Sequence, residues 1–167
     1  MPLGDPMGGE YEYGEEGTVK GIWISAVPVS DLDQATEFFN QVLGLEILLD
    51  ARENNWVELG VEGPSGNLGL YVPSPLDDRQ PGGVTGIVFK SQSIYDVHKR
   101  LVDFDVVFTL KPERQEWGGL LASFKDPDGN EFTVMEDPEH YSRSIPRDAG
   151  YDIGSSCFLP GASRPEK

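Results

Sequence analysis

Four side chains stand out as candidates for acid–base or metal chemistry. They are two histidines, His98 and His140, and the carboxylates of Glu58 and Glu136. Glu58 shares a predicted strand face with Trp56, where burial would suit a general base, although an exposed strand carboxylate is the more ordinary outcome. Glu136 and His140 could form an acid–base or metal pair after the last predicted strand, and a surface turn is the alternative. His98 lies one position off the apolar stripe of a predicted helix, which favours a solvent-facing or rim position over a catalytic base.

Nucleophilic and phosphate chemistry have less support. Cys157 is the only cysteine, so the chain has neither an intramolecular disulfide nor a cysteine-rich zinc site. It lies in a C-terminal stretch without a His–Asp context, which argues against a catalytic nucleophile. The glycines are scattered at predicted turns and form no phosphate-binding loop.

The three tryptophans are better candidates for contacting a ligand. Trp117 is expected to open a strand in a Glu-Trp-Gly-Gly context, Trp56 lies within an earlier strand, and Trp23 lies on the first strand. Any one tryptophan taken alone is more often a core residue than a pocket residue. Aromatic walls of a cleft suit planar or apolar small molecules, so we expect Trp56 and Trp117 at such a site.

The composition excludes several classes of function. The chain has 167 residues with 29 acidic and 13 basic side chains, for a net charge of −16. Nucleic acids and anionic membranes both need a basic surface, so neither is expected as a partner. No apolar run approaches a membrane span, and the N-terminus lacks the pattern of a signal peptide, so we expect a cytoplasmic location. The acidity fits either an ordinary solvated surface or a salty cytoplasm.

The elements that must position these side chains form an internal repeat of strand, helix and three strands. The first copy has strands near 19–29, 46–50, 55–60 and 67–72, and a helix that Asp31 caps and Gly44 ends. The second has strands near 84–90, 106–110, 120–125 and 131–136, and a helix that runs from Ser93 to Asp105. The two caps are 62 residues apart, and the two helix ends are 61 apart. We therefore divide the chain into a flexible acidic arm (1–17), a first module (18–73), a linker (74–83), a second module (84–137) and an irregular tail (138–167).

Three stretches then resemble the vicinal-oxygen-chelate superfamily, which includes glyoxalases, bleomycin- and fosfomycin-resistance proteins and extradiol dioxygenases. The resemblance lies in residues 28–46, in residues 82–89, and in Glu116-Trp117-Gly118-Gly119 followed by Phe124-Lys125-Asp126-Pro127-Asp128-Gly129-Asn130. Within the superfamily the chain is most similar to a poorly characterised glyoxalase-like subgroup. The resemblance implies an α+β fold of two βαβββ modules whose curved sheets enclose a cleft, and it implies a homodimer.

The resemblance also implies where a metal would bind, with one His, Gln or Glu on the first and last strand of each module. Carried onto this sequence, the position seven residues after Asp126 is Thr133, and subtracting the repeat offset gives Tyr71. The two first-strand positions are Ile24 and Gly86. Isoleucine and glycine have no side-chain donor, and threonine and tyrosine are poor substitutes for imidazole or carboxylate. We therefore expect neither a metal site nor a cofactor.

The leading hypothesis is a metal-free member of the superfamily that binds a small, partly aromatic organic molecule in the inter-module cleft. The expected cleft residues are Ile24, Trp56, Tyr71, Gly86, Trp117 and Thr133. One alternative is a lyase, isomerase or dioxygenase with a displaced metal site or an acid–base pair, in which Glu58, Glu136 and His140 would converge. Another is a subunit-interaction protein whose arm and tail dock on a neighbour.

Overall fold

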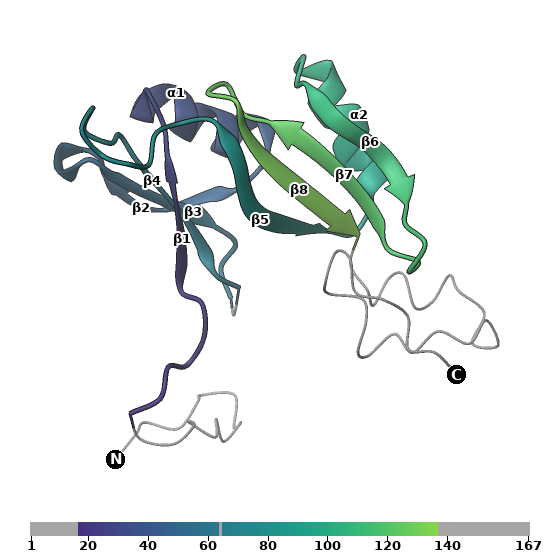
Figure 1. Ribbon diagram of the computed structural model, residues 1–167, viewed down its shortest axis with the longest axis horizontal. Helices are drawn as coiled ribbons and strands as arrows, with labels where there is room; N and C mark the ends of the chain where they lie inside the picture. The colour runs from purple at the N-terminus through teal and green to yellow at the C-terminus, as the bar shows by residue number, and fades with distance from the viewer. Residues whose placement is uncertain (1–16, 64, 137–167) are drawn as a thin grey trace.

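The computed structural model describes residues 17–63 and 65–136, which contain eight strands and four helical segments (Figure 1). The predicted arm and tail, with His140 and Cys157, lie outside the described residues. The first module contains β1 (Ile24–Pro28), α1 (Leu32–Glu37), η1 (Phe38–Val42), β2 (Glu46–Ala51), η2 (Arg52–Asn54), β3 (Trp56–Gly60) and β4 (Asn67–Tyr71). The second contains β5 (Gly83–Ser91), α2 (Ile94–Asp103), β6 (Phe108–Arg114), β7 (Leu120–Lys125) and β8 (Asn130–Glu136).

Each module forms one mixed sheet of four strands, in the order β1-β4-β3-β2 and β5-β8-β7-β6. The first strand of each module pairs in parallel with the last, and the other pairings are antiparallel. The predicted α+β fold of two βαβββ modules is therefore confirmed. The division into domains stays a prediction, because nearly all of the predicted arm and the whole of the predicted tail lie outside the described residues.

The helices begin and end where local side-chain chemistry predicts. The Asp31 carboxylate accepts a hydrogen bond from the Gln34 amide at 2.9 Å, and the Ser93 hydroxyl caps α2 in the same way. Gly44 and Asp105 follow the two helical segments with φ of +87° and +58°, in the left-handed region. Local sequence therefore sets where each helical segment begins and ends.

Some predicted boundaries were wrong at the ends of strands. The first strand begins at Ile24 instead of residue 19, and Val19 and Trp23 before it are 93% and 78% exposed. The second strand of the second module, predicted near 106–110, is β6, which begins at Phe108 and extends to Arg114. Trp117 lies in the connection between β6 and β7, before the strand that it was predicted to open. The apolar residues before Ile24 therefore do not mark a buried strand.

A shared core joins the modules. Phe39 of η1 contacts Phe132 of β8 at 5.4 Å between ring centroids, and Phe132 also packs on Phe89 and Phe124. Arg100 of α2 donates to the carbonyls of Gln41 and Val42, at the end of η1. Aromatic burial therefore continues from one sheet to the other instead of stopping at the repeat boundary.

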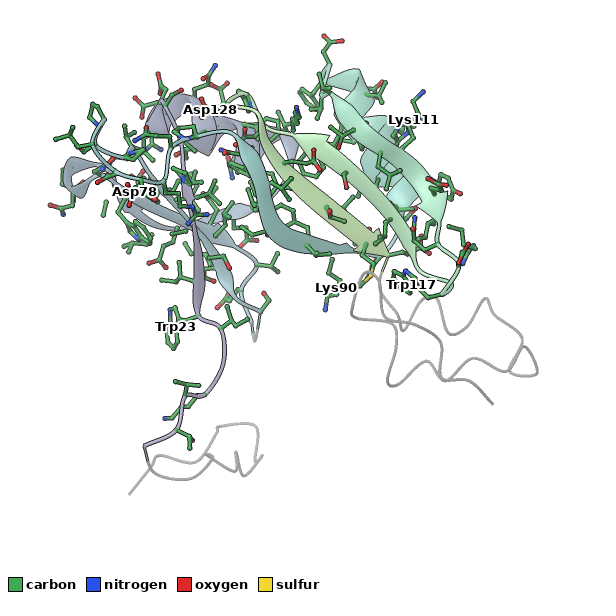
Figure 2. All side chains as sticks on the ribbon, viewed as in Figure 1. Trp23, Asp78, Lys90, Lys111, Trp117 and Asp128 are labelled. Carbon is green, nitrogen blue, oxygen red and sulfur yellow. The ribbon has the colours of Figure 1, made fainter. Side chains whose placement is uncertain are left out.

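The Asp-Pro-Asp-Gly-Asn turn holds the modules together by hydrogen bonds. Asn130 is 1% exposed, donates to the Pro28 carbonyl at 3.0 Å and accepts from the Gly82 amide at 2.7 Å. Asp128 accepts hydrogen bonds from the amide and the hydroxyl of Ser30, just before α1. Figure 2 shows Asp128 at this end of β8, beside α1. We call residues 126–130 the inter-module clip.

Asp126 organises this clip from within. Its carboxylate accepts from the amides of Asp128 and Asn130 and from the Asn130 side chain, at 2.8 to 2.9 Å. Burial raises the pKa of Asp126, and the hydrogen bonds from Asn130 and Asp128 oppose that rise without cancelling it.

Candidate functional site

A cavity of about 660 Å³ lies between the two modules. Ser25, Leu59 and Leu68 form its wall in the first module, and Ile87 and Phe89 of β5 form its wall in the second. A few polar side chains, including Asn67, Glu62 and Lys90, complete the lining. This size and this mixture of apolar walls with scattered polar groups are typical of small-molecule pockets.

The cavity reaches both faces of the sheets, because Asn67 and Lys90 alternate with the core residues Leu68 and Phe89. Leu59 and Leu68 are buried in the core with Phe39, so they point to the face that α1 covers. Phe89 belongs to the same core from the other module. Sequence reasoning missed these lining residues, because buried strand residues next to a cavity have the same pattern as ordinary core residues.

None of the six predicted cleft residues lines this cavity. Three of them, Ile24, Trp56 and Tyr71, lie on the face of the first sheet that is opposite α1, as strand alternation from buried Val57 and Leu70 requires. They are half-buried there. The first module therefore brings half of the predicted set onto one face.

The other three predicted residues belong to the second module. Thr133 lies on the face opposite α2, where its hydroxyl is 3.1 Å from that of Ser123. Gly86 lies in an irregular stretch of β5 with φ of +73°. The Trp117 ring covers Gly119, where a Cβ would lie 2.0 Å from the ring. Figure 2 shows Trp117 at the β6–β7 end of the molecule, far from β1, so the six residues do not form one cluster.

The strand registers change which residue of the first module corresponds to Thr133 in the second. Ala26 pairs with Gly69, and Val88, which is 62 residues after Ala26, pairs with Thr133. The counterpart of Thr133 is therefore Gly69, at an offset of 64, and Tyr71 pairs with Pro28 instead. The offset of 62 holds for the first strand and the helix but not for the last strand.

The metal site that the resemblance implies does not fit these residues. An added Cβ on Gly69 would lie 2.4 Å from the Trp56 ring and 3.0 Å from Ile24, so the indole covers the point from which a ligand side chain would project. Gly86 has no side chain, and Thr133 offers only a hydroxyl. Within 17–63 and 65–136, no three His, Cys, Asp or Glu side chains gather closely enough to hold a metal ion.

The candidate acid–base residues are held apart in different elements. Glu58 on β3 accepts hydrogen bonds from Trp56 Nε1 at 2.9 Å and from Asn67 Nδ2 at 3.2 Å. Glu136, at the end of β8, faces the first amide of α2 at 3.5 Å. His98 packs edge-on against Phe108 at 4.7 Å between ring centroids. These contacts give His98 and Glu136 structural partners within the second module.

In the part of the chain that the structure describes, no helix is both long and apolar enough to span a lipid bilayer.

Comparison with known proteins agrees with this fold. A comparison with curated protein sequences found no match. A glyoxalase/bleomycin resistance protein/dioxygenase superfamily member from Sphaerobacter thermophilus DSM 20745 is 33% identical, with a TM-score of 0.65, over 71% of this chain and 98% of that one. TnmS3, an antibiotic binding protein from Streptomyces sp. CB03234, is 26% identical, with a TM-score of 0.63, over 71% and 96%. A lactoylglutathione lyase from Agrobacterium tumefaciens, 20% identical over 71% and 94% with a TM-score of 0.57, shares the fold.

The family model for the Glyoxalase/Bleomycin resistance protein/Dioxygenase superfamily matches residues 22–134, which include all eight strands except the last two residues of β8. The two βαβββ modules, the strand orders and the solved structures agree with that match. The chain therefore belongs to the glyoxalase/bleomycin resistance protein/dioxygenase superfamily.

Proposed function

We propose that this protein binds a small, partly aromatic organic molecule in the cleft between its modules, without a bound metal. The observation that carries the proposal is the cavity of about 660 Å³ between the first sheet and β5. Its apolar walls include Phe89, whose ring can pack on a planar ligand, and Asn67 and Lys90 can orient polar groups. The likeness to an antibiotic binding protein at 26% identity supports binding over turnover.

The donor set supports the metal-free part of the proposal. Metal-dependent activation of a substrate oxygen needs several nitrogen or oxygen ligands around one ion. Ile24, Gly69 and Gly86 cannot supply them, and Thr133 supplies one hydroxyl. The described residues likewise do not support the alternative of a lyase, isomerase or dioxygenase, because Glu58 and Glu136 lie in different sheets and have separate partners.

A substitution that fills the cavity tests the proposal. Ser25→Phe places a ring where the half-buried Ser25 lines the cavity, and Thr109→Phe makes the same change on an exposed residue of β6. In a thermal-shift screen of small aromatic compounds, a ligand present at about 100 times its Kd should stabilise the parent protein by about 2.7 kcal/mol.

The hits should also bind Thr109→Phe and fail to stabilise Ser25→Phe, while circular dichroism shows that both variants are folded. Hits that bind Ser25→Phe as tightly as the parent protein would place the ligand elsewhere. A screen without any hit would count against a small-molecule binding protein.

We also propose that the protein is a cytoplasmic homodimer. β2 is an edge strand, and Ile47, Leu48 and Leu49 in succession are exposed along it. Exposed apolar edge strands are sites where a second copy can pair. Sedimentation analysis should show a dimer that Ile47→Lys weakens and that Val102→Lys, at an exposed position of α2, leaves intact. A monomer at all concentrations would refute this assignment.

A further inference from the structure

A carboxylate and an indole form a fixed pair on the face of the first sheet opposite α1. Glu58 receives one hydrogen bond on each carboxylate oxygen, from Trp56 Nε1 at 2.9 Å and from Asn67 Nδ2 at 3.2 Å. Both donors are uncharged. In the described part of the chain, no Lys, Arg or His side chain lies within 4.0 Å of this carboxylate, since the ion pairs there join Arg52 to Asp33 and Asp50. The half-buried negative charge of Glu58 is therefore hydrogen-bonded but not neutralised.

The indole of Trp56 is held in place on the sheet. The six-membered ring lies over Gly69, where a Cβ would come within 2.4 Å of Cη2 and 2.6 Å of Cζ2. Only glycine at position 69 lets the ring lie this close, and the hydrogen bond to Glu58 fixes its direction. One side of the ring thus rests on the sheet at Gly69, while the side chain as a whole is only half-buried.

An apolar surface adjoins this pair. Leu49 of β2 pairs with Glu58, so its side chain lies on the same sheet face, and it is 47% exposed. An indole, an apolar side chain and a carboxylate with unused lone pairs are the features that recognise an organic cation. The charge of −16 on the whole chain attracts cations as well.

We propose that the Trp56–Glu58 pair binds an organic ammonium ion, in which a protonated primary or secondary amine is attached to an apolar or aromatic body. The ammonium donates to the free lone pairs of Glu58, and the body packs on Trp56 and Leu49. Trp56 and Glu58 do not line the inter-module cavity, and they lie on the opposite sheet face from its residues Leu59 and Leu68. The pair is therefore a separate site that borders the cavity at Asn67, and it goes beyond the function proposed above.

The indole N–H of Trp56 provides a direct probe, because it donates to Glu58 itself. We would record ¹H–¹⁵N spectra of the full-length protein, assign this resonance with Trp56→Phe, and titrate two probes at pH 7. The probes are 2-phenylethylammonium and its neutral analogue 2-phenylethanol. We expect the ammonium to shift the Trp56 resonance and to bind about tenfold more tightly than the alcohol.

Two matched variants separate local charge from overall charge. Glu58→Gln removes the charge and keeps a side-chain acceptor for Trp56 or Asn67, whereas Glu53→Gln removes one charge from an exposed residue of η2. We expect Glu58→Gln to abolish the roughly tenfold preference for the ammonium, and Glu53→Gln to keep it.

Equal binding of the two probes by the parent protein would overturn the proposal without need of any variant. So would an ammonium preference that Glu58→Gln leaves intact, or a Trp56 resonance that is unmoved by about 10 mM ammonium, a concentration well above a Kd near 1 mM.

Discussion

Replacing Asn130 with alanine tests whether the inter-module clip stabilises the fold. The side chain is 1% exposed and makes three hydrogen bonds, to the Pro28 carbonyl, the Gly82 amide and Asp126, at 2.7 to 3.0 Å. Each is worth about 1 kcal/mol net, and a buried partner that is left unpaired costs about 1–3 kcal/mol. We therefore expect Asn130→Ala to lower the free energy of unfolding by about 3 kcal/mol or more.

Urea denaturation followed by far-UV circular dichroism measures this loss. With an m-value of about 2 kcal/mol/M, the midpoint should fall by about 1.5 M. The matched control is Asn40→Ala in the first module, which removes the part-buried bond from Asn40 to the Leu45 carbonyl and an exposed bond that Asn40 accepts from the Gln41 side chain. That variant should lose only about 1 kcal/mol. If Asn130→Ala lost no more than Asn40→Ala, the clip would not hold the modules together.

Two further predictions concern single residues. Gly69→Ala should displace the Trp56 ring, because the new Cβ would lie 2.4 Å from it. We expect the free energy of unfolding to fall by about 1–3 kcal/mol and the Trp56 indole N–H resonance to shift. An unchanged resonance would contradict the packing of Trp56 on Gly69. The pKa of Asp126 is raised in the folded protein above its ordinary value of 3.8. Protonation of Asp126 therefore adds to the free energy of unfolding in full below about pH 3.8, and this addition is lost as the pH rises through the folded pKa. The unfolding free energy of the parent protein minus that of Asp126→Asn should therefore decline as the pH rises from that value, and a difference that grew with pH would refute the assignment.

The features that sequence predicted well depend on near neighbours in the chain. Asp31 and Ser93 cap helices because their side chains reach an amide three residues on. Asp105 adopts the left-handed conformation because it ends α2 at the place where Gly44 ends the first helical segment. The alternation of Phe132 and Val134 with Thr133 follows directly from strand geometry.

The features that sequence missed depend on pairing between distant strands. A two-residue shift in the repeat makes Gly69 the counterpart of Thr133, and only the registers of β4 and β8 reveal it. The packing of Trp56 on Gly69 and the bond from Asn130 to Pro28 link residues 13 and 102 positions apart. The resemblance marked the clip as a motif, and the structure gives it a physical role in joining the modules.

Metal titration tests the central claim, a metal-free binding protein of this superfamily, most directly. Purified protein would first be analysed for bound metal, then treated with a chelator, dialysed and titrated with Zn²⁺, Ni²⁺, Mn²⁺ and Fe²⁺ in a calorimeter. We expect no stoichiometric binding of any of the four ions, because the implied ligand positions lack suitable donors. Ile24, Gly69 and Gly86 have no side-chain donor, and Thr133 has only a hydroxyl. One tight site per chain would contradict the account and favour a metal-dependent enzyme.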